Sequence, residues 1–370
     1  MTDLLKFTAE LVDIPSVSHG ETAITDHLER LLAPVPWLEV TRLGDNVVAR
    51  TRCARSRRLI LVGHTDTVPP SGNAGARIVP GAGVGEEGDV LWGLGSADMK
   101  GGVAVLAELA RTVAEPAVDV TYVFYECEEV DSRFNGVERL FRERPDLLEA
   151  DAALLAEPTG ARVEAGCQGT MRAEVTMTGR RAHSARAWKG VNAIHRIGPL
   201  LEALAAHKPR LVEIDGCLFR EGLQAVRVAG GVAGNVVPDE AVVTLNHRFA
   251  PDRTPAEAED HLRRFVDGAL PGGADGFSVI DVAPGAAPAL DHPLLQGLLA
   301  ATGEPPRAKL GWTDVARFAA RGVPATNFGP GDPNVAHSAE ERVTRDDLES
   351  VFATLSDLIT GSHDRPAGGR

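Results

Sequence analysis

Short apolar runs alternate with helix-like segments in the first part of this 370-residue chain. Leu59–Val62 and Ala152–Ala156 are apolar runs of strand length, and Val118–Tyr125 is rich in β-branched and aromatic residues. Val103–Val113 has helical periodicity, as has the C-terminal segment Leu348–Ile359. Strands separated by helices favour βαβ units. We therefore expect an α/β fold whose mainly parallel or mixed sheet carries helices on both faces.

The middle of the chain has a different pattern. Alternating residues predict strands, and residues at helical spacing predict two helices between them. Gly230, Gly231 and Gly234 mark a turn between two paired strands. The expected strands are 171–178, 224–228, 241–248 and 277–282, and the expected helices are 191–204 and 255–270. This strand and helix count suits a small α+β unit of the ferredoxin-like type.

Charge and composition exclude several classes of partner. Lys and Arg total 38 while Asp and Glu total 52, which gives a formal net charge of −14. Nucleic acids and anionic membranes attract clustered positive charge, so we expect neither as a partner. No apolar run approaches the roughly 18 residues that a membrane span needs. The sequence predicts a globular protein acting on small molecules.

The N-terminal segment and the cysteines indicate a reduced, cytoplasmic protein. Residues 1–12 carry Asp3 and Glu10 on an amphipathic pattern, without the basic start of a secretory signal. The four cysteines lie at positions 53, 127, 167 and 217, too far apart for a CxxC motif or a zinc ribbon.

Residues of metal-ligand type stand at or near the expected strand ends. Each has an ordinary structural explanation by itself, such as a loop histidine, a helix-capping aspartate or a solvated acidic turn. Ligands gather at the carboxyl ends of strands in open α/β sheets, however, and a mixed nitrogen and oxygen set suits zinc or a similar divalent ion. Three carboxylates with one hydroxide would balance two divalent cations. The candidate ligands are His64, Asp98, Glu129, Glu157 and His337.

Two further acidic residues adjoin these candidates. Asp66 lies two residues after His64, close enough to accept the second imidazole N–H. Glu128 precedes Glu129, and successive residues of an extended chain point in opposite directions. One of the two carboxylates could therefore bind a metal while the other faces a substrate. Glu126 is an alternative for this second role.

Seven segments, taken in order, resemble the dinuclear-zinc aminoacylase and carboxypeptidase family, which includes acetylornithine deacetylases and succinyl-diaminopimelate desuccinylases. The resemblance covers most of the chain, and the segments are GHTDTVP, SADMKGG, CEEV, AEPT, GRRAHSARAWKGVNAIH, GNVVPDEA and AHSAEERV. It implies two divalent metal ions, with zinc expected first and cobalt or manganese acceptable to the same ligands. It also implies that Asp98 bridges both ions. His64 and Glu157 would complete one site, and Glu129 and His337 the other.

The same resemblance implies a domain organisation. A discontinuous metal-binding domain, residues 1–170 and 285–370, would be interrupted by an inserted lid of residues 171–284, with hinges near Gly169 and Pro284. The lid would form a homodimer. His183 on the lid would reach the active site of the partner subunit and help to stabilise an oxyanion.

The implied reaction is hydrolysis of an N-acyl amide, with Glu128 as general base and Asp66 as the partner of His64. The stretches GCQGTMR and AHSARAWKGVNAIH most resemble desuccinylases of actinobacterial type. They imply cleavage of N-succinyl-LL-2,6-diaminopimelate to succinate and LL-2,6-diaminopimelate, a step of lysine and diaminopimelate biosynthesis.

Binding of such a substrate requires cations for its carboxylates. By motif position, Asn235 and Arg248 would contact them, with Arg172 or Arg317 as further candidates. Thr313 and Asp314 would contact the amine end.

Other functions remain open at this point. The chain could be an acetylornithine deacetylase or another N-acyl-amino-acid deacylase or metallopeptidase of the same family. It could also be a metal-binding protein without turnover, although the presence of Glu128 beside Glu129 argues against this.

Overall fold

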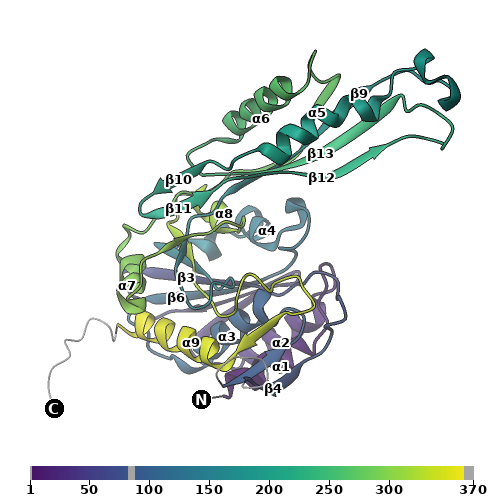
Figure 1. The fold of residues 1–370 in the computed structure, drawn as a ribbon. Coiled ribbons are helices and arrows are strands. Elements are labelled where there is room, and N and C mark those ends of the chain that lie inside the picture. Colours follow the sequence, from purple (N-terminus) through teal and green to yellow (C-terminus); the bar gives the residue numbers. More distant parts are fainter. Residues whose placement is uncertain (1, 82–87, 362–370) are drawn as a thin grey trace. The chain divides into compact units, whose positions relative to one another are not determined.

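The computed structural model describes residues 2–81 and 88–361, and the chain forms two compact units (Figure 1). Unit 1 comprises Met1–Ala165, Pro288–Arg307 and Arg317–Arg370. Unit 2 comprises Gly166–Ala287 and Ala308–Ala316. The roles expected for a metal-binding domain and a lid stay predictions.

Unit 1 is built on a mixed eight-stranded sheet. Its strands follow the order β1-β2-β6-β3-β7-β16-β8-β15. The central strands β6, β3, β7 and β16 pair in parallel, whereas β1 with β2, β2 with β6, and β16 with β8 pair antiparallel. The α/β class with a mixed central sheet is therefore confirmed. The strand bounds are β1 Leu38–Leu43, β2 Asn46–Thr51, β3 Arg58–His64, β6 Asp119–Tyr125, β7 Ala152–Leu155, β8 Glu164–Ala165, β15 Arg307–Ala308 and β16 Ala325–Asn327.

Helices and a small second sheet complete unit 1. The apolar faces of α1, α2, α3 and α9 pack with the central strands in one hydrophobic core. Every residue of β6 is buried, as expected for a strand covered on both faces. The helices are α1 Leu4–Val12, α2 Thr22–Leu32, α3 Gly101–Thr112, α4 Gly136–Glu143, α7 Pro293–Thr302, α8 Val315–Ala319, whose first two residues group with unit 2, and α9 Arg345–Thr360. The second sheet has the order β17-β5-β4, formed by Arg342–Thr344, Asp89–Trp92 and Arg77–Pro80.

Local sequence signals explain several helix ends. Thr344 caps α9 by accepting the backbone N–H of Asp347 at 3.0 Å. In unit 2, Thr254 and Glu257 form a complete capping box at the start of α6. These bonds satisfy backbone donors that the first helical turn leaves without a partner.

Unit 2 is an antiparallel sheet covered by two helices. Its strands follow the order β12-β13-β9-β14, formed by Gly222–Gly230, Glu240–Phe249, Gly169–Thr178 and Gly276–Ala283. Helices α5, Ala193–Ala206, and α6, Pro255–Ala269, cover one face of this sheet (Figure 1). A separate hairpin pairs β10, Leu211–Ile214, with β11, Cys217–Arg220. The four strands and two helices expected from the sequence are all present.

Two observations concern the whole described chain. None of its described helices is both long enough and apolar enough to cross a bilayer. All four cysteines are free thiols.

Candidate metal centre

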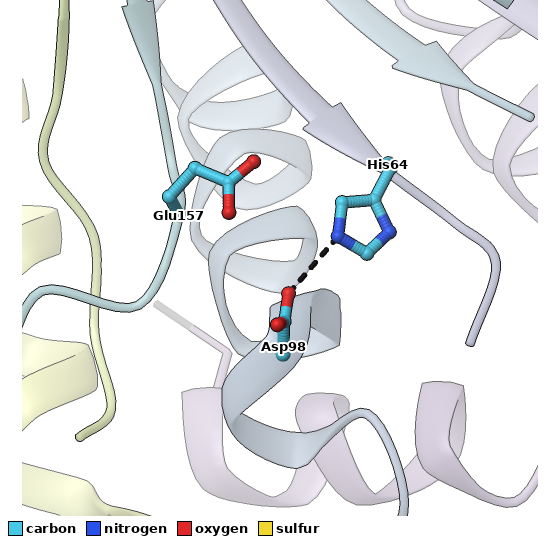
Figure 2. A group of neighbouring side chains, drawn as sticks. All are labelled: His64, Asp98 and Glu157. Atoms are coloured by element: carbon cyan, nitrogen blue, oxygen red, sulfur yellow. Dashed lines mark hydrogen bonds and ion pairs between the residues drawn. The ribbon is translucent and has the colours of Figure 1, made fainter. Parts of the chain in front are cut away.

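His64 is the last residue of β3 and is buried. Its Nδ1 lies 3.0 Å from the backbone carbonyl oxygen of Asp66 and 3.4 Å from that residue's carboxylate, while its Nε2 lies 3.0 Å from Oδ1 of Asp98 (Figure 2). Burial opposes protonation of the ring, but the hydrogen bonds with Asp66 and Asp98 outweigh it and hold the pKa of His64 well above its ordinary value. Because Nδ1 is engaged by Asp66 and Nε2 contacts Asp98, Nε2 is the nitrogen that faces the candidate centre.

Asp98 stands between two histidines. It belongs to the one-turn segment Ser96–Lys100 that precedes α3, where its φ of −117° and ψ of 94° depart from helical values. Its Oδ1 contacts His64, and its Oδ2 lies 3.3 Å from Nε2 of His337. Burial alone would raise the pKa of Asp98, but the hydrogen bonds with the two imidazoles lower it. Asp98 thus has one oxygen for each side of the centre.

Glu129 and His337 form the second side. Nε2 of His337 lies 2.7 Å from Oε1 of Glu129. Hydrogen bonds with Asp98 and Glu129 raise the pKa of His337 to about 10. The two residues come from a turn after β6 and from the loop before β17.

The five candidate ligands form two groups that share Asp98. Ligand atoms of His64, Asp98 and Glu157 lie within 4.8 Å of one another, and so do those of Asp98, Glu129 and His337. Figure 2 shows the carboxylate of Glu157, which is buried two residues beyond β7, turned toward the His64–Asp98 pair. Ligands of a tetrahedral zinc ion at about 2.1 Å lie roughly 3.5 Å from one another. The donor set and its spacing therefore fit two divalent ions.

Glu128 lies beside this centre. Its carboxylate offers an oxygen within 4.8 Å of ligand atoms of His64 and Glu129. The alternative, Glu126, accepts hydrogen bonds from the Asn46 amide at 2.7 Å and from Arg139 at 3.2 Å. Glu126 is thereby engaged in contacts with β2 and α4.

Asp66 holds the turn that carries both glutamates. Its Oδ1 accepts the backbone N–H of Glu128 at 3.0 Å, and its Oδ2 accepts that of Glu129 at 3.1 Å. The hydroxyl of Ser18 donates to Oδ2 at 2.7 Å. Burial acts to raise the pKa of Asp66, but the hydrogen bond and charge attraction with His64, followed by the bonds from Ser18 and Glu128, keep it below its ordinary value. The sequence indicated only the link to His64, because the amides of the turn lie 62 and 63 positions away.

Of the remaining candidates, Arg317 belongs to unit 1 and the others belong to unit 2. The segments that carry His183 and Asn235 are paired: His183 forms an antiparallel bridge with Val236, and the backbone N–H of Ser184 donates to the carbonyl of Asn235 at 2.9 Å. Arg248 stands on β13 opposite Thr170 of β9 and Gly222 of β12. Thr313 and Asp314 are buried. The substrate-binding roles of these residues stay predictions.

Comparison with known proteins gives close relatives. A Mycobacterium tuberculosis protein provisionally named succinyl-diaminopimelate desuccinylase DapE is 53% identical over 360 residues, which cover 97% of this chain and 98% of that protein. The succinyl-diaminopimelate desuccinylase of Corynebacterium glutamicum is 44% identical over 366 residues, covering 97% of this chain and 96% of that protein.

Solved structures share the fold. A tripeptidase from Staphylococcus aureus matches with a TM-score of 0.75 at 20% identity, covering 98% of each chain. A Bacillus subtilis protein described as a dinuclear metal binding peptidase from the M20 family matches with a TM-score of 0.70 at 17% identity, again covering 98% of each chain.

The profile of peptidase family M20/M25/M40 matches residues 60–361. Together with the identities above, this match shows that the chain belongs to peptidase family M20/M25/M40.

Proposed function

We propose that this protein is a metal-dependent amidohydrolase that cleaves N-succinyl-LL-2,6-diaminopimelate to succinate and LL-2,6-diaminopimelate. The observation that carries the chemistry is the pair of ligand groups that share Asp98, with Glu128 beside them. Support for the substrate comes from the names of the relatives at 53% and 44% identity over nearly the whole chain.

The proposed cofactor is a pair of divalent ions, most readily zinc. Two imidazoles and three carboxylates form the donor set, which zinc, cobalt and manganese all accept. His64, Glu157 and Asp98 would hold one ion, and His337, Glu129 and Asp98 the other. Bound divalent ions supply Lewis-acid polarisation of an amide carbonyl and lower the pKa of water toward neutrality.

Glu128 would move the proton. The carboxylate of Glu128 accepts a proton from the attacking water and delivers it to the nitrogen of the departing amine. Asp66 contributes by fixing the backbone of Glu128 and Glu129 together, so that base and ligand keep their relative positions. The reaction consumes one water and releases a carboxylate and an amine.

Unit 2 would supply oxyanion and substrate contacts. Nδ1 of His183 accepts the backbone N–H of Ala185 at 3.1 Å, so the proton of the neutral ring sits on Nε2. This exposed N–H suits the proposed donation to a developing oxyanion in the partner subunit of a homodimer. Unit 2 would then serve as lid and dimerisation domain.

Arg248 is the best placed cation for a substrate carboxylate. Arg172 is already paired with Asp281 at 3.0 Å, and Arg317 with Glu138 at 3.1 Å. Burial and the like charge of Arg172 lower the pKa of Arg248, so an added carboxylate would be favourable there. We also propose a cytoplasmic location, which the four free thiols support.

A parallel substrate panel tests the function. Purified protein is assayed with added zinc or cobalt on succinyl-diaminopimelate, N-acetylornithine, other N-acetyl amino acids and dipeptides. We expect the highest kcat/KM on succinyl-diaminopimelate. A higher value on N-acetylornithine would identify a deacetylase instead, and bound metal without turnover on any substrate would identify a binding protein.

A further inference from the structure

Glu341 is a buried carboxylate that the proposed reaction does not use. Its residue is 1% exposed, and it lies four positions after His337, directly before β17. Its Oε1 accepts the backbone N–H of Asp98 at 3.0 Å and that of Ala97 at 3.2 Å. Its own backbone carbonyl accepts the N–H of Gly93 at 3.2 Å.

Keeping a carboxylate in this place is energetically costly. Burial removes the water that would hydrate the Glu341 carboxylate, and the acidic side chain of Asp98 lies nearby. A buried carboxylate is tolerated when hydrogen bonds and an opposite charge compensate for lost hydration. The buried Lys100 provides such a charge, and its Nζ is fixed by the carbonyl of Ile14 at 2.8 Å.

The bonds of Glu341 fall on a segment that departs from regular helix geometry. Asp98 and Met99 depart from helical φ and ψ values inside the segment Ser96–Lys100. Regular helix bonding therefore does not fix the direction of the Asp98 side chain. The amides of Asp98 itself and of Ala97, the residue before it, both donate to Oε1 of Glu341.

We propose that Glu341 is a positioning residue, which ties the loop carrying His337 to the turn carrying Asp98. This inference rests on the metal centre of the proposed function. The same short segment that supplies His337 also fixes the backbone of Asp98, so the two ligands of one ion keep their separation. Removal of a residue that orients a metal ligand without touching the metal typically lowers metal affinity by about 10–100-fold.

Metal titration of the metal-free protein tests this role. Cobalt(II) is added to wild type, Glu341→Ala, Glu341→Gln and, as a matched control, Glu108→Gln. Glu108 is a buried carboxylate in α3 that accepts the backbone N–H of Thr2 at 2.9 Å. Affinity for each ion and the visible absorption spectrum of the cobalt form are measured, together with the thermal unfolding of the metal-free proteins.

Glu341→Ala should weaken binding of one of the two ions by about 10–100-fold and alter the cobalt spectrum. Glu341→Gln keeps an acceptor oxygen and should restore most of the affinity, while Glu108→Gln should match wild type in both readouts. If Glu341→Ala does not fold, Glu341→Asp, one methylene shorter, is expected to show the same loss.

Wild-type affinity and spectrum in a folded Glu341→Ala or Glu341→Asp protein would overturn the positioning role while leaving the metal centre intact. Failure of the wild type to bind cobalt would overturn the proposed function and this inference with it.

Discussion

Nε2 of His337 lies 2.7 Å from a carboxylate oxygen of Glu129, although 208 positions separate the two residues in the sequence. The same nitrogen lies 3.3 Å from Asp98, whose other oxygen contacts His64. A single acidic side chain thus connects two histidine-containing groups. The division into two groups gives a direct expectation for metal content.

His337→Ala should bind about one divalent ion per chain where wild type binds two, because His337 belongs only to the group with Glu129. Elemental analysis after dialysis against dilute zinc measures the content. Glu157→Ala is the complementary variant, since Glu157 belongs only to the other group. Two ions retained in both variants would contradict the assignment of these ligands.

Glu128→Gln should keep its metal and lose turnover. The amide cannot accept the proton from water, and positioned acid–base catalysis contributes about 10²–10⁴-fold. Steady-state kinetics with metal analysis on the same sample separates the two effects. Glu126→Gln is the matched control, because the Glu126 carboxylate is held by Asn46 and Arg139. A larger loss of kcat in the control would transfer the role of base to Glu126.

Arg248→Gln should raise KM for the succinylated substrate by about 10–100-fold with a smaller change in kcat, since a hydrogen bond to a charged group contributes about 1.5–3 kcal/mol. Arg172→Gln on the neighbouring strand is the control, because Arg172 is already paired with Asp281. An unchanged KM for Arg248→Gln would remove this residue from the substrate site.

Unit 2 should lose stability in mild acid because of His247. Burial lowers the pKa of this imidazole from 6.5 to about 4, so the unfolded chain takes up a proton at higher pH than the folded chain. Above pH 6.5 the ring is neutral in both states and takes nothing from the free energy of unfolding. As the pH falls from 6.5 toward 4, proton uptake by the unfolded chain lowers the free energy of unfolding progressively. A shift of this size corresponds to about 3 kcal/mol.

Urea unfolding at neutral and mildly acidic pH measures this dependence. His247→Leu should reduce the difference between the two conditions, whereas the exposed His195→Leu should leave it unchanged. An identical pH dependence in wild type and His247→Leu would show that other groups cause it.

The longer helices and strands could be predicted from the sequence, because the spacing of apolar residues reflects which side of each element is buried. The strands β3, β6 and β7 and the helices α3 and α9 all appear where apolar spacing indicates them. The short strands β8 and β15 could not be predicted, because two residues are too few to show an alternation of apolar and polar side chains. Pairing with distant segments creates such strands.

In the candidate site, too, one part could be predicted from the sequence and another could not. Residue type and position at strand ends pointed to the five ligand candidates, which the structure brings together. The supporting contacts of Asp66 and Glu341 were not predictable, because their partners are backbone amides 62 to 244 positions away. Backbone amides have no sequence signature, so only the folded chain shows which carboxylate meets them.

The late position of His337 has a consequence for biosynthesis. During translation, His64, Asp98, Glu129 and Glu157 leave the ribosome well before β16 can pair with β7 and the final loop can follow. A nascent chain therefore holds at most one of the two ligand groups. Under the proposed ligand assignment, the second group is completed only after the loop with His337 has emerged and folded against the strands made much earlier.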